Sequence, residues 1–407
     1  MSLGVELYDT LIGTIEGDAR TFDFTPTIEG IERFGPNSAV LSVSIPLSPS
    51  QRRDHADRRR NWLGELLPEG DQYDYMLSQG KIARGDTPSF LARYGRDVAG
   101  ALQIWDQEDP AEPVMPSTRH LSRKQVRALL TDPIGAPLAN APGVGKSSLG
   151  GVQPKVVLVR TTSGWAQAIG GFPTTHILKP QLGGDKATVI YDEEYGSRLA
   201  RRMGLAEFDT QIEHFDDVAA LVIERFDRED GKRVHQEDFS QVLGATRNEK
   251  YQELGGVVSL KRVAESLIRN ATGADLVRFA RMVVFSVGIG NLDMHTKNLG
   301  LVHPKEGDLS LAPAYDVVPQ AHMPNDGRLA LAVNGRYVHN EITRDDLHAE
   351  FVAWGLRNSA RVINDTLEEL QAVAKEEVEL DGSVLALQDR ILVFVDNLLY
   401  GSPVGGR

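Results

Sequence analysis

Apolar and polar positions alternate through the first 50 residues, with frequent turns between the apolar runs. This period of two is typical of half-buried strands. It predicts short strands at residues 5–8, 11–15 and 39–45, which would form a small sheet. From 52 to 95 the apolar positions recur with helical spacing instead. The N-terminal part of the chain is therefore predicted to be a small sheet followed by helices.

Further along, short continuous apolar runs predict the strands of a second sheet. These runs lie at residues 156–160, 176–179 and 221–226. A short helix is predicted near 121–130, before the first of them. A helical run at 193–203 separates the last two, with Tyr195, Leu199 and Met203 at four-residue spacing on one face. The middle of the chain is therefore predicted to be rich in strands.

From about residue 236 the pattern is mostly helical, and two long helices are predicted at 345–376 and 382–400. A short β-like pair near 299–311 and a turn-rich insertion at 319–340 interrupt the helices. The stretch 107–116 carries three prolines and several acids, so it is a linker candidate. These features predict three parts: a β-rich N-terminal domain at 1–107, a strand-rich lobe at 108–230 and a helical lobe at 231–407.

Composition narrows the classes of function. The chain has 407 residues, 41% of them apolar, which is enough for a large core. It has no cysteine, which excludes disulfides, thiolate metal sites and cysteine nucleophiles. The net charge of -13 argues against broad binding to nucleic acid. Neither a signal peptide nor an apolar run long enough to span a membrane is present, so a cytoplasmic protein is expected.

The candidate chemistry centres on residues 291–298, where Asp293 precedes Asn298 by five positions. This is the spacing of the catalytic loop in phosphoryl transfer, in which the Asp orients the attacking hydroxyl and the Asn holds magnesium. Asp316 follows a strand-like run downstream, as the second magnesium-binding aspartate of a kinase does. The spacing alone also arises by chance. Together with an upstream strand lysine, it predicts an ATP-dependent kinase.

Upstream, Lys179 ends an apolar strand and could direct its ammonium group to phosphates, or it could be a surface lysine. Glu194 in the following helix is a candidate partner for that lysine, with Glu193 as the competing candidate. Alternatively, Glu194 is an ordinary acid facing solvent. The segment 224–227 ends the next predicted strand. In a kinase, main-chain groups at this place bind adenine. Alternatively, the segment is the end of an edge strand that enters a polar turn.

The segment 140–148 nearly matches the P-loop pattern, but Asn140 stands where the first glycine belongs and a strand is predicted after it. A genuine P-loop is therefore not expected. A glycine-rich loop over the phosphates of ATP remains compatible with the sequence, and so does a plain loop. Ser147 and Ser148 in this loop are candidate phosphate acceptors.

Several motifs in one order resemble the HipA family of bacterial toxin–antitoxin serine/threonine kinases. The matching stretches are residues 66–69, 148–155, 173–179, 222–228, 237–244, 291–298 and 315–318. The resemblance covers roughly residues 5 to 400. It implies an α+β, protein-kinase-like two-lobed fold, with a strand-rich lobe, an all-helical lobe and an extra β-rich N-terminal domain.

The resemblance also implies roles for individual residues. Asp293 would be the catalytic aspartate, Asn298 and Asp316 would hold Mg²⁺, and Ser148 would be the self-phosphorylated serine, in a loop that is displaced when modified. The residues expected to bind ATP are Lys179, Lys155, Val152, Glu224, Phe226, Asp227 and His295. Of these, Glu224 and Phe226 would flank adenine through their backbones.

The partners that the resemblance implies are ATP, a protein substrate (an aminoacyl-tRNA synthetase in the best-known case) and a HipB-like DNA-binding antitoxin. DNA would be bound only through the antitoxin complex, and no membrane is expected. Two alternatives remain open. The chain could be a kinase-like scaffold that serves mainly as antitoxin partner and transcriptional corepressor, or it could be a small-molecule or lipid kinase.

Overall fold

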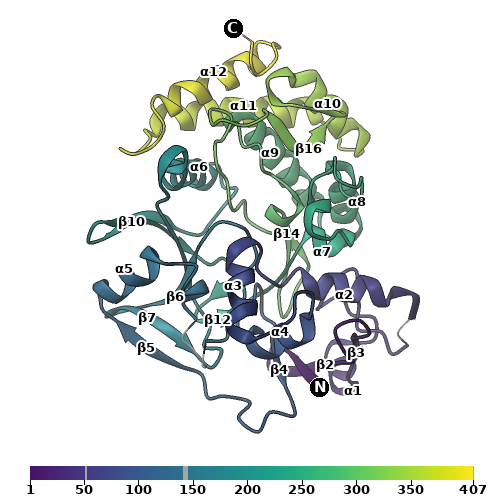
Figure 1. Cartoon of the computed structure of the whole chain (residues 1–407). Coiled ribbons are helices and arrows are strands. Elements are labelled where there is room, and N and C mark those ends of the chain that lie inside the picture. Colours follow the sequence, from purple (N-terminus) through teal and green to yellow (C-terminus); the bar gives the residue numbers. More distant parts are fainter. Residues whose placement is uncertain (51–52, 141–144, 407) are drawn as a thin grey trace. The chain divides into compact units, whose positions relative to one another are not determined.

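The computed structural model describes residues 1–50, 53–140 and 145–406 (Figure 1). The chain forms two compact units. The first unit contains residues 1–180, 213–237 and 302–307, and the second contains residues 181–212, 238–301 and 308–407. Two strands, β13 (His235–Asp238) and β14 (Gly300–His303), include residues of both units. Within the described ranges, no helix is long and apolar enough to cross a membrane.

The N-terminal part of the first unit is a four-stranded sheet with helices packed on one core. The strand order is β3-β2-β1-β4, and a tight turn at Tyr8 and Asp9, both with positive φ, joins β1 to β2. The bounds are β1 Ser2–Leu7, β2 Thr10–Glu16, β3 Asp23–Pro26, β4 Gln103–Asp106, α1 Ile28–Phe34, α2 Ala56–Gly64, α3 Gly70–Gly80 and α4 Thr87–Tyr94. The predicted strands at 5–8 and 11–15 and the helical stretch are confirmed.

The strand predicted at 39–45 is wrong, because this segment is irregular. Its polar backbone groups bond to side chains rather than to a neighbouring strand. The carbonyl of Leu41 pairs with Nε2 of His235 at 2.8 Å. The backbone N–H of Val43 donates to the carboxylate of Glu237 at 2.9 Å, and so does the hydroxyl of Ser42 at 2.5 Å. The alternating pattern correctly predicted buried apolar side chains in this segment. However, hydrogen bonds to the side chains of His235 and Glu237 take the place of hydrogen bonds to a neighbouring strand.

The rest of the first unit is built on a six-stranded sheet with the order β5-β7-β6-β8-β10-β9. The bounds are β5 Ser117–Leu121, β6 Val156–Thr161, β7 Gly164–Ile169, β8 His176–Pro180, β9 Thr210–Phe215, β10 Val218–Glu224 and, before β6, α5 Arg123–Thr131. The three predicted strands and the helix are confirmed. Three strands were missed, among them β5, which is exposed at four of its five positions and so lacks an apolar pattern.

The second unit is mainly helical. Its helices are α6 Val189–Arg202, α7 Phe239–Leu243, α8 Leu260–Asn270, α9 Gly273–Ile289, α10 Arg344–Ala353, α11 Ser359–Glu376 and α12 Leu387–Leu399. Helix α9 is buried over most of its circumference and packs against α11 and α12. The single helix predicted at 345–376 is two helices, because Gly355 and Asn358 adopt positive φ and break the helical path.

Two strands lie in the insertion that was predicted only as rich in turns. They are β16 (Arg328–Val333) and β17 (Arg336–Val338), and they pair in antiparallel fashion. Asn334 and Gly335 connect them, both with positive φ. An Asn-Gly pair between two short apolar runs is a strong hairpin signal, and it could have been identified from the sequence.

A buried histidine of the first unit makes the folding stability depend on pH. Nε2 of His235 donates to the Leu41 carbonyl, and Nδ1 faces the backbone N–H of Ala101 at 3.4 Å, which fits a neutral ring. Burial, together with the neighbouring His303, lowers the pKa of His235 from 6.5 to about 3. The unfolded chain therefore binds a proton at His235 between pH 6.5 and 3 that the folded protein does not bind.

We accordingly expect the free energy of unfolding to fall as the pH is lowered through this window. The contribution of His235 is up to about 1.4 kcal/mol per pH unit, the value for one proton. Urea unfolding at several pH values would measure it, and His235→Gln should flatten the dependence. The same substitution at the exposed His214 is the matched control. An equal slope in the wild type and His235→Gln would contradict this assignment.

Candidate active site

The loop at residues 291–298 follows helix α9, whose C-cap residue, Gly290, has a φ of +73°. Hydrogen bonds between residues close in sequence support the conformation of this loop. The side-chain carbonyl of Asn291 accepts from the backbone N–H of Asp293 at 3.1 Å. The side-chain amide of Asn298 donates to the backbone carbonyl of Asp293 at 2.9 Å. Both main-chain groups of Asp293 are therefore held by amide side chains, and its carboxylate is 38% exposed.

Two aromatic side chains of the second unit lie beside that carboxylate. The hydroxyl of Tyr251 donates to Oδ1 of Asp293 at 3.2 Å. Nε2 of His295 lies 3.9 Å from Oδ2. The rings of Tyr251 and His295 meet edge to face, with centroids 5.3 Å apart. His295 was predicted to bind ATP, and the structure places it next to Asp293; contact with ATP stays a prediction.

Asp316 follows the short strand β15 (Ser310–Leu311). Its φ of +55° is uncommon for a residue other than glycine, although aspartate tolerates it. The hydroxyl of the preceding Tyr315 donates to the carbonyl of Lys297 at 2.8 Å. This bond ties the Asp316 segment to the loop at residues 291–298, next to Asn298.

The donor set fits Mg²⁺. Because Nδ2 of Asn298 is a donor to Asp293, its Oδ1 is the atom that can ligate a cation, and Asp316 adds a carboxylate. Magnesium commonly takes one or two carboxylates and completes its shell with water and substrate phosphates. Within the described residues there is no cluster of three or more His, Asp or Glu that could form an all-protein metal cage. The roles of Asn298 and Asp316 as magnesium ligands stay predictions.

In the first unit, Lys179 lies on β8 opposite Leu221 of β10 and is 5% exposed. It is therefore not the solvent-facing lysine of the alternative interpretation. Strand β10 ends at Glu224, and the next N–H, that of Arg225, donates to the Thr175 carbonyl at 2.9 Å. The side chain of Glu224 is exposed and that of Phe226 is half-buried. The proposed main-chain contacts of these two residues with adenine stay predictions.

Glu194 lies on α6 and accepts from Arg198 of the next helical turn, at 3.1 and 3.2 Å. Arg198 also donates to Glu377 at 2.7 Å. Glu194 is thus 5% exposed rather than solvent-facing, and it already has a cationic partner in its own unit. The competing candidate, Glu193, is 1% exposed on the same helix. Which of the two pairs with Lys179 stays a prediction.

The loop before β6 is folded against the N-terminal part of the first unit. The hydroxyl of Ser148 donates to the Leu66 carbonyl at 2.8 Å and is fully buried, and its N–H donates to the Asp97 carbonyl at 2.9 Å. Nζ of Lys155 donates to the Gly150 carbonyl at 2.7 Å, whereas Val152 is 60% exposed. Strand β6 follows this loop, as predicted, whereas a P-loop opens a helix. Residues 141–144 of the P-loop-like segment lie outside the described residues.

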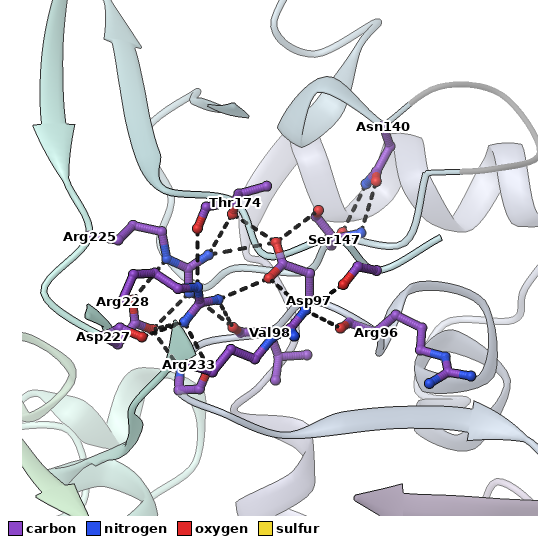
Figure 2. Close-up of polar contacts among 12 residues, drawn as sticks. Arg96, Asp97, Val98, Asn140, Ser147, Thr174, Arg225, Asp227, Arg228 and Arg233 are labelled. Atoms are coloured by element: carbon purple, nitrogen blue, oxygen red, sulfur yellow. Dashed lines mark hydrogen bonds and ion pairs between the residues drawn. The ribbon is translucent and has the colours of Figure 1, made fainter. Parts of the chain in front are cut away.

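A buried network of charges joins this loop to the end of β10. Figure 2 shows the Asp97 carboxylate facing Arg228 and Ser147. Arg228 donates to Oδ1 at 2.9 Å, and the Ser147 hydroxyl donates to Oδ2 at 3.2 Å. Thr174 also donates to Oδ2, at 2.7 Å, and accepts from Arg225. Burial raises the pKa of Asp97, but the nearby arginines outweigh it and hold that pKa below its usual value.

Asp227 belongs to the same network. Its carboxylate accepts two hydrogen bonds from Arg225, at 2.9 and 2.7 Å, and one from the N–H of Gly100 at 2.7 Å. Arg228 lies 3.2 Å from it. Despite burial, these partners hold the pKa of Asp227 well below its usual range. Its side chain therefore takes part in this network, and the predicted contact of this segment with ATP through the main chain stays a prediction.

Asp97 and Tyr251 were both missed by the sequence reasoning. Neither lies in a spacing that marks chemistry, and each acts through residues far away in the chain. The only available signal was that Asp97 follows an arginine in an apolar region where a charge needs a partner.

The chain matches two protein-family models and several known sequences. The family model for the HipA N-terminal domain matches residues 3–105, and the model for the HipA-like C-terminal domain matches residues 147–377, more than half of the chain. "Putative kinase Y4mE" of Sinorhizobium fredii is 30% identical over 365 residues, which cover 84% of this chain and 85% of that protein. "Serine/threonine-protein kinase toxin HipA" of Shewanella oneidensis is 27% identical, with 90% and 86% covered.

A solved structure is similar to this chain over nearly its whole length. The complex of HipA, HipB and operator DNA from Shewanella oneidensis contains a chain that matches this one with a TM-score of 0.79 and 25% identity. The match covers 98% of this chain and 96% of that one. The predicted kinase-like α+β fold class is confirmed. The domain boundaries predicted at 107 and 230 stay predictions.

Proposed function

The chain belongs to the HipA family, and from this we propose that it is an ATP- and Mg²⁺-dependent serine/threonine protein kinase that acts as the toxin of a toxin–antitoxin pair. The observation that carries the proposal is the geometry of Asp293. Its main chain is held on both sides by amide side chains, while its carboxylate remains partly exposed. A group that orients a substrate hydroxyl needs this combination of rigidity and access.

In the proposed reaction, the oxygen of a serine hydroxyl attacks the γ-phosphorus of ATP. The bond from that phosphorus to the β–γ bridging oxygen breaks, and ADP leaves. Asp293 accepts a hydrogen bond from the attacking hydroxyl and takes its proton. Lys179 would offset phosphate charge, as a buried lysine at a strand end can.

Magnesium would be held by Asn298 and Asp316, and when bound it neutralises charge on the phosphates. The chain's own contribution is to orient these two ligands. Asn298 uses its amide nitrogen to bond the Asp293 carbonyl, so its amide oxygen is the atom that would ligate the cation, and Tyr315 anchors the Asp316 segment.

The proposed partners are inferred from those of a related protein. The Shewanella oneidensis structure contains HipA, HipB and operator DNA. We therefore propose that this chain binds a HipB-like antitoxin and contacts DNA through that complex, and that its target is a protein such as an aminoacyl-tRNA synthetase. The net charge of -13 would suit the scaffold alternative as well, because an acidic surface complements a basic DNA-binding partner. A pure corepressor has no chemical need for Asp293, Asn298, Asp316 and Lys179 together.

Self-phosphorylation would require Ser148 to leave its present position. Its hydroxyl is fully buried and already donates to the Leu66 carbonyl. A phosphate on this oxygen would bring negative charge against that carbonyl in a buried site, which is costly. The modified loop is therefore expected to stay displaced from the Asp97 and Leu66 contacts.

We expect Ser148→Ala to abolish the incorporation of label from γ-labelled ATP into the chain. The alanine fits the buried position and removes only the acceptor oxygen. Mass spectrometry of the wild type should place the phosphate on Ser148. Ser147→Ala is the matched control, since it removes the neighbouring hydroxyl and should leave the label on Ser148. Phosphate found on a different residue would contradict the assignment.

A further inference from the structure

We propose that Tyr251 is a positioning residue for phosphoryl transfer, because its hydroxyl selects the orientation of the Asp293 carboxylate. This role rests on the proposed kinase function. An ionised carboxylate can only accept hydrogen bonds, so the 3.2 Å contact with Oδ1 has Tyr251 as the donor. This bond holds the carboxylate in one orientation, in which it receives the substrate hydroxyl.

The position of Tyr251 is set by the strand that also holds the catalytic loop. The N–H of Ala330 on β16 donates to the carbonyl of Leu292 at 2.9 Å. The carbonyl of the same Ala330 accepts from the N–H of Gln252 at 3.0 Å. The side chain of Gln252 accepts a further bond from the N–H of Ala332 at 2.9 Å. Ala330 thus forms hydrogen bonds both with the residue after Tyr251 and with the residue before Asp293.

A second set of contacts joins the same two segments on the other side. The hydroxyl of Thr296 in the catalytic loop lies 3.4 Å from the carbonyl of Lys250 and 2.8 Å from the hydroxyl of Ser240. Thr296 is fully buried. The ring of His295 packs edge to face against the Tyr251 ring. The phenol therefore reaches Asp293 from a segment anchored on both flanks, and little freedom has to be lost when substrate arrives.

The contact has a chemical consequence beyond packing. A carboxylate that can rotate presents either oxygen to the hydroxyl at several angles, and only some of these are productive. The Tyr251 hydroxyl reduces this freedom in the ground state. Its loss should therefore slow the chemical step and leave the binding of ATP unchanged.

The test is Tyr251→Phe, which keeps the ring against His295 and removes only the hydroxyl. At saturating Mg-ATP we expect the rate of label incorporation into Ser148 to fall about tenfold, as loss of one hydrogen bond to a charged group implies. The ATP concentration at half-maximal rate and the melting temperature should stay at the wild-type values. Tyr94→Phe is the matched control, because it removes a buried hydroxyl that donates to the Met76 carbonyl at 3.3 Å in the N-terminal part of the chain.

The outcomes separate the two levels of the proposal. A wild-type rate in Tyr251→Phe, in a preparation where Asp293→Asn is inactive, would overturn the role of Tyr251 and leave the kinase proposal intact. A slower rate accompanied by weaker ATP binding or a lower melting temperature would assign Tyr251 to structure or to nucleotide binding, and would also overturn the positioning role. Absence of label in the wild type would overturn the proposed function, and the role of Tyr251 with it.

Discussion

Replacing Asp293 with asparagine is expected to lower the rate of phosphoryl transfer by roughly 100-fold or more, while ATP still binds. Removing a catalytic base or an electrostatic contact typically has an effect of this size. Asparagine has nearly the same shape as aspartate, and the main-chain bonds to Asn291 and Asn298 do not involve the carboxylate. The loop should therefore keep its conformation. The measurement is the rate of transfer from γ-labelled ATP, beside calorimetric titration with Mg-ATP.

A matched control is Asp326→Asn, an exposed aspartate of the second unit whose carboxylate bonds only locally, to the N–H of Arg328. This variant should transfer phosphate at the wild-type rate. Wild-type turnover by Asp293→Asn would remove the catalytic role assigned to Asp293. Loss of ATP binding in that variant would instead place Asp293 in nucleotide recognition.

The second large effect is expected on stability, from Asp97→Asn. Asp97 is 1% exposed, and its carboxylate faces Arg228 at 2.9 Å, Arg233 at 3.6 Å and Arg225 at 3.8 Å. Without this charge, Arg225 and Arg228 keep Asp227 as a carboxylate partner, at 2.7 and 3.2 Å (Figure 2). Breaking a buried ion pair by removing one partner typically costs about 3–5 kcal/mol, because the other charges stay buried. Urea unfolding should show a loss of this order.

Asp217→Asn provides the comparison, because Asp217 pairs with Arg127 at the surface of the same unit. Exposed pairs are screened by water, so this variant should unfold almost like the wild type. The Asp97 variant should also label Ser148 faster, since its carboxylate accepts from Ser147 beside that serine. An unfolding curve unchanged by Asp97→Asn would contradict this prediction. It would mean that water or a rearrangement of side chains compensates for the lost ion pairs of the arginines.

Much of the candidate site could be predicted from the sequence because its parts are local. Asp293 and Asn298 are five residues apart in one loop, and the structure joins them by a hydrogen bond. The strands that carry Lys179 and Glu224 were recognisable as continuous apolar runs. Such patterns report on each segment's own burial and do not depend on which distant segment covers it.

What the tertiary structure alone decided are contacts between residues far apart in sequence. The alternation of apolar and polar residues predicted a strand at 39–45. The segment is irregular because its hydrogen-bonding groups pair with the side chains of Glu237 and His235 instead of a neighbouring strand. Likewise, only the fold brings the Asp97 carboxylate to Arg228, which lies 131 positions further along the chain.

The sequence by itself determined the order of a small sheet, a strand-rich part and a helical part, and it marked residues 291–298 as a candidate catalytic loop. It could do so because hydrophobic periodicity and short motif spacing are properties of neighbouring residues. Only the folded chain decided that Ser148 is buried, that Asp97 holds its loop and that Tyr251 reaches Asp293. The physical reason is that a buried polar group must find a partner, and the fold rather than the local sequence determines which group is within reach.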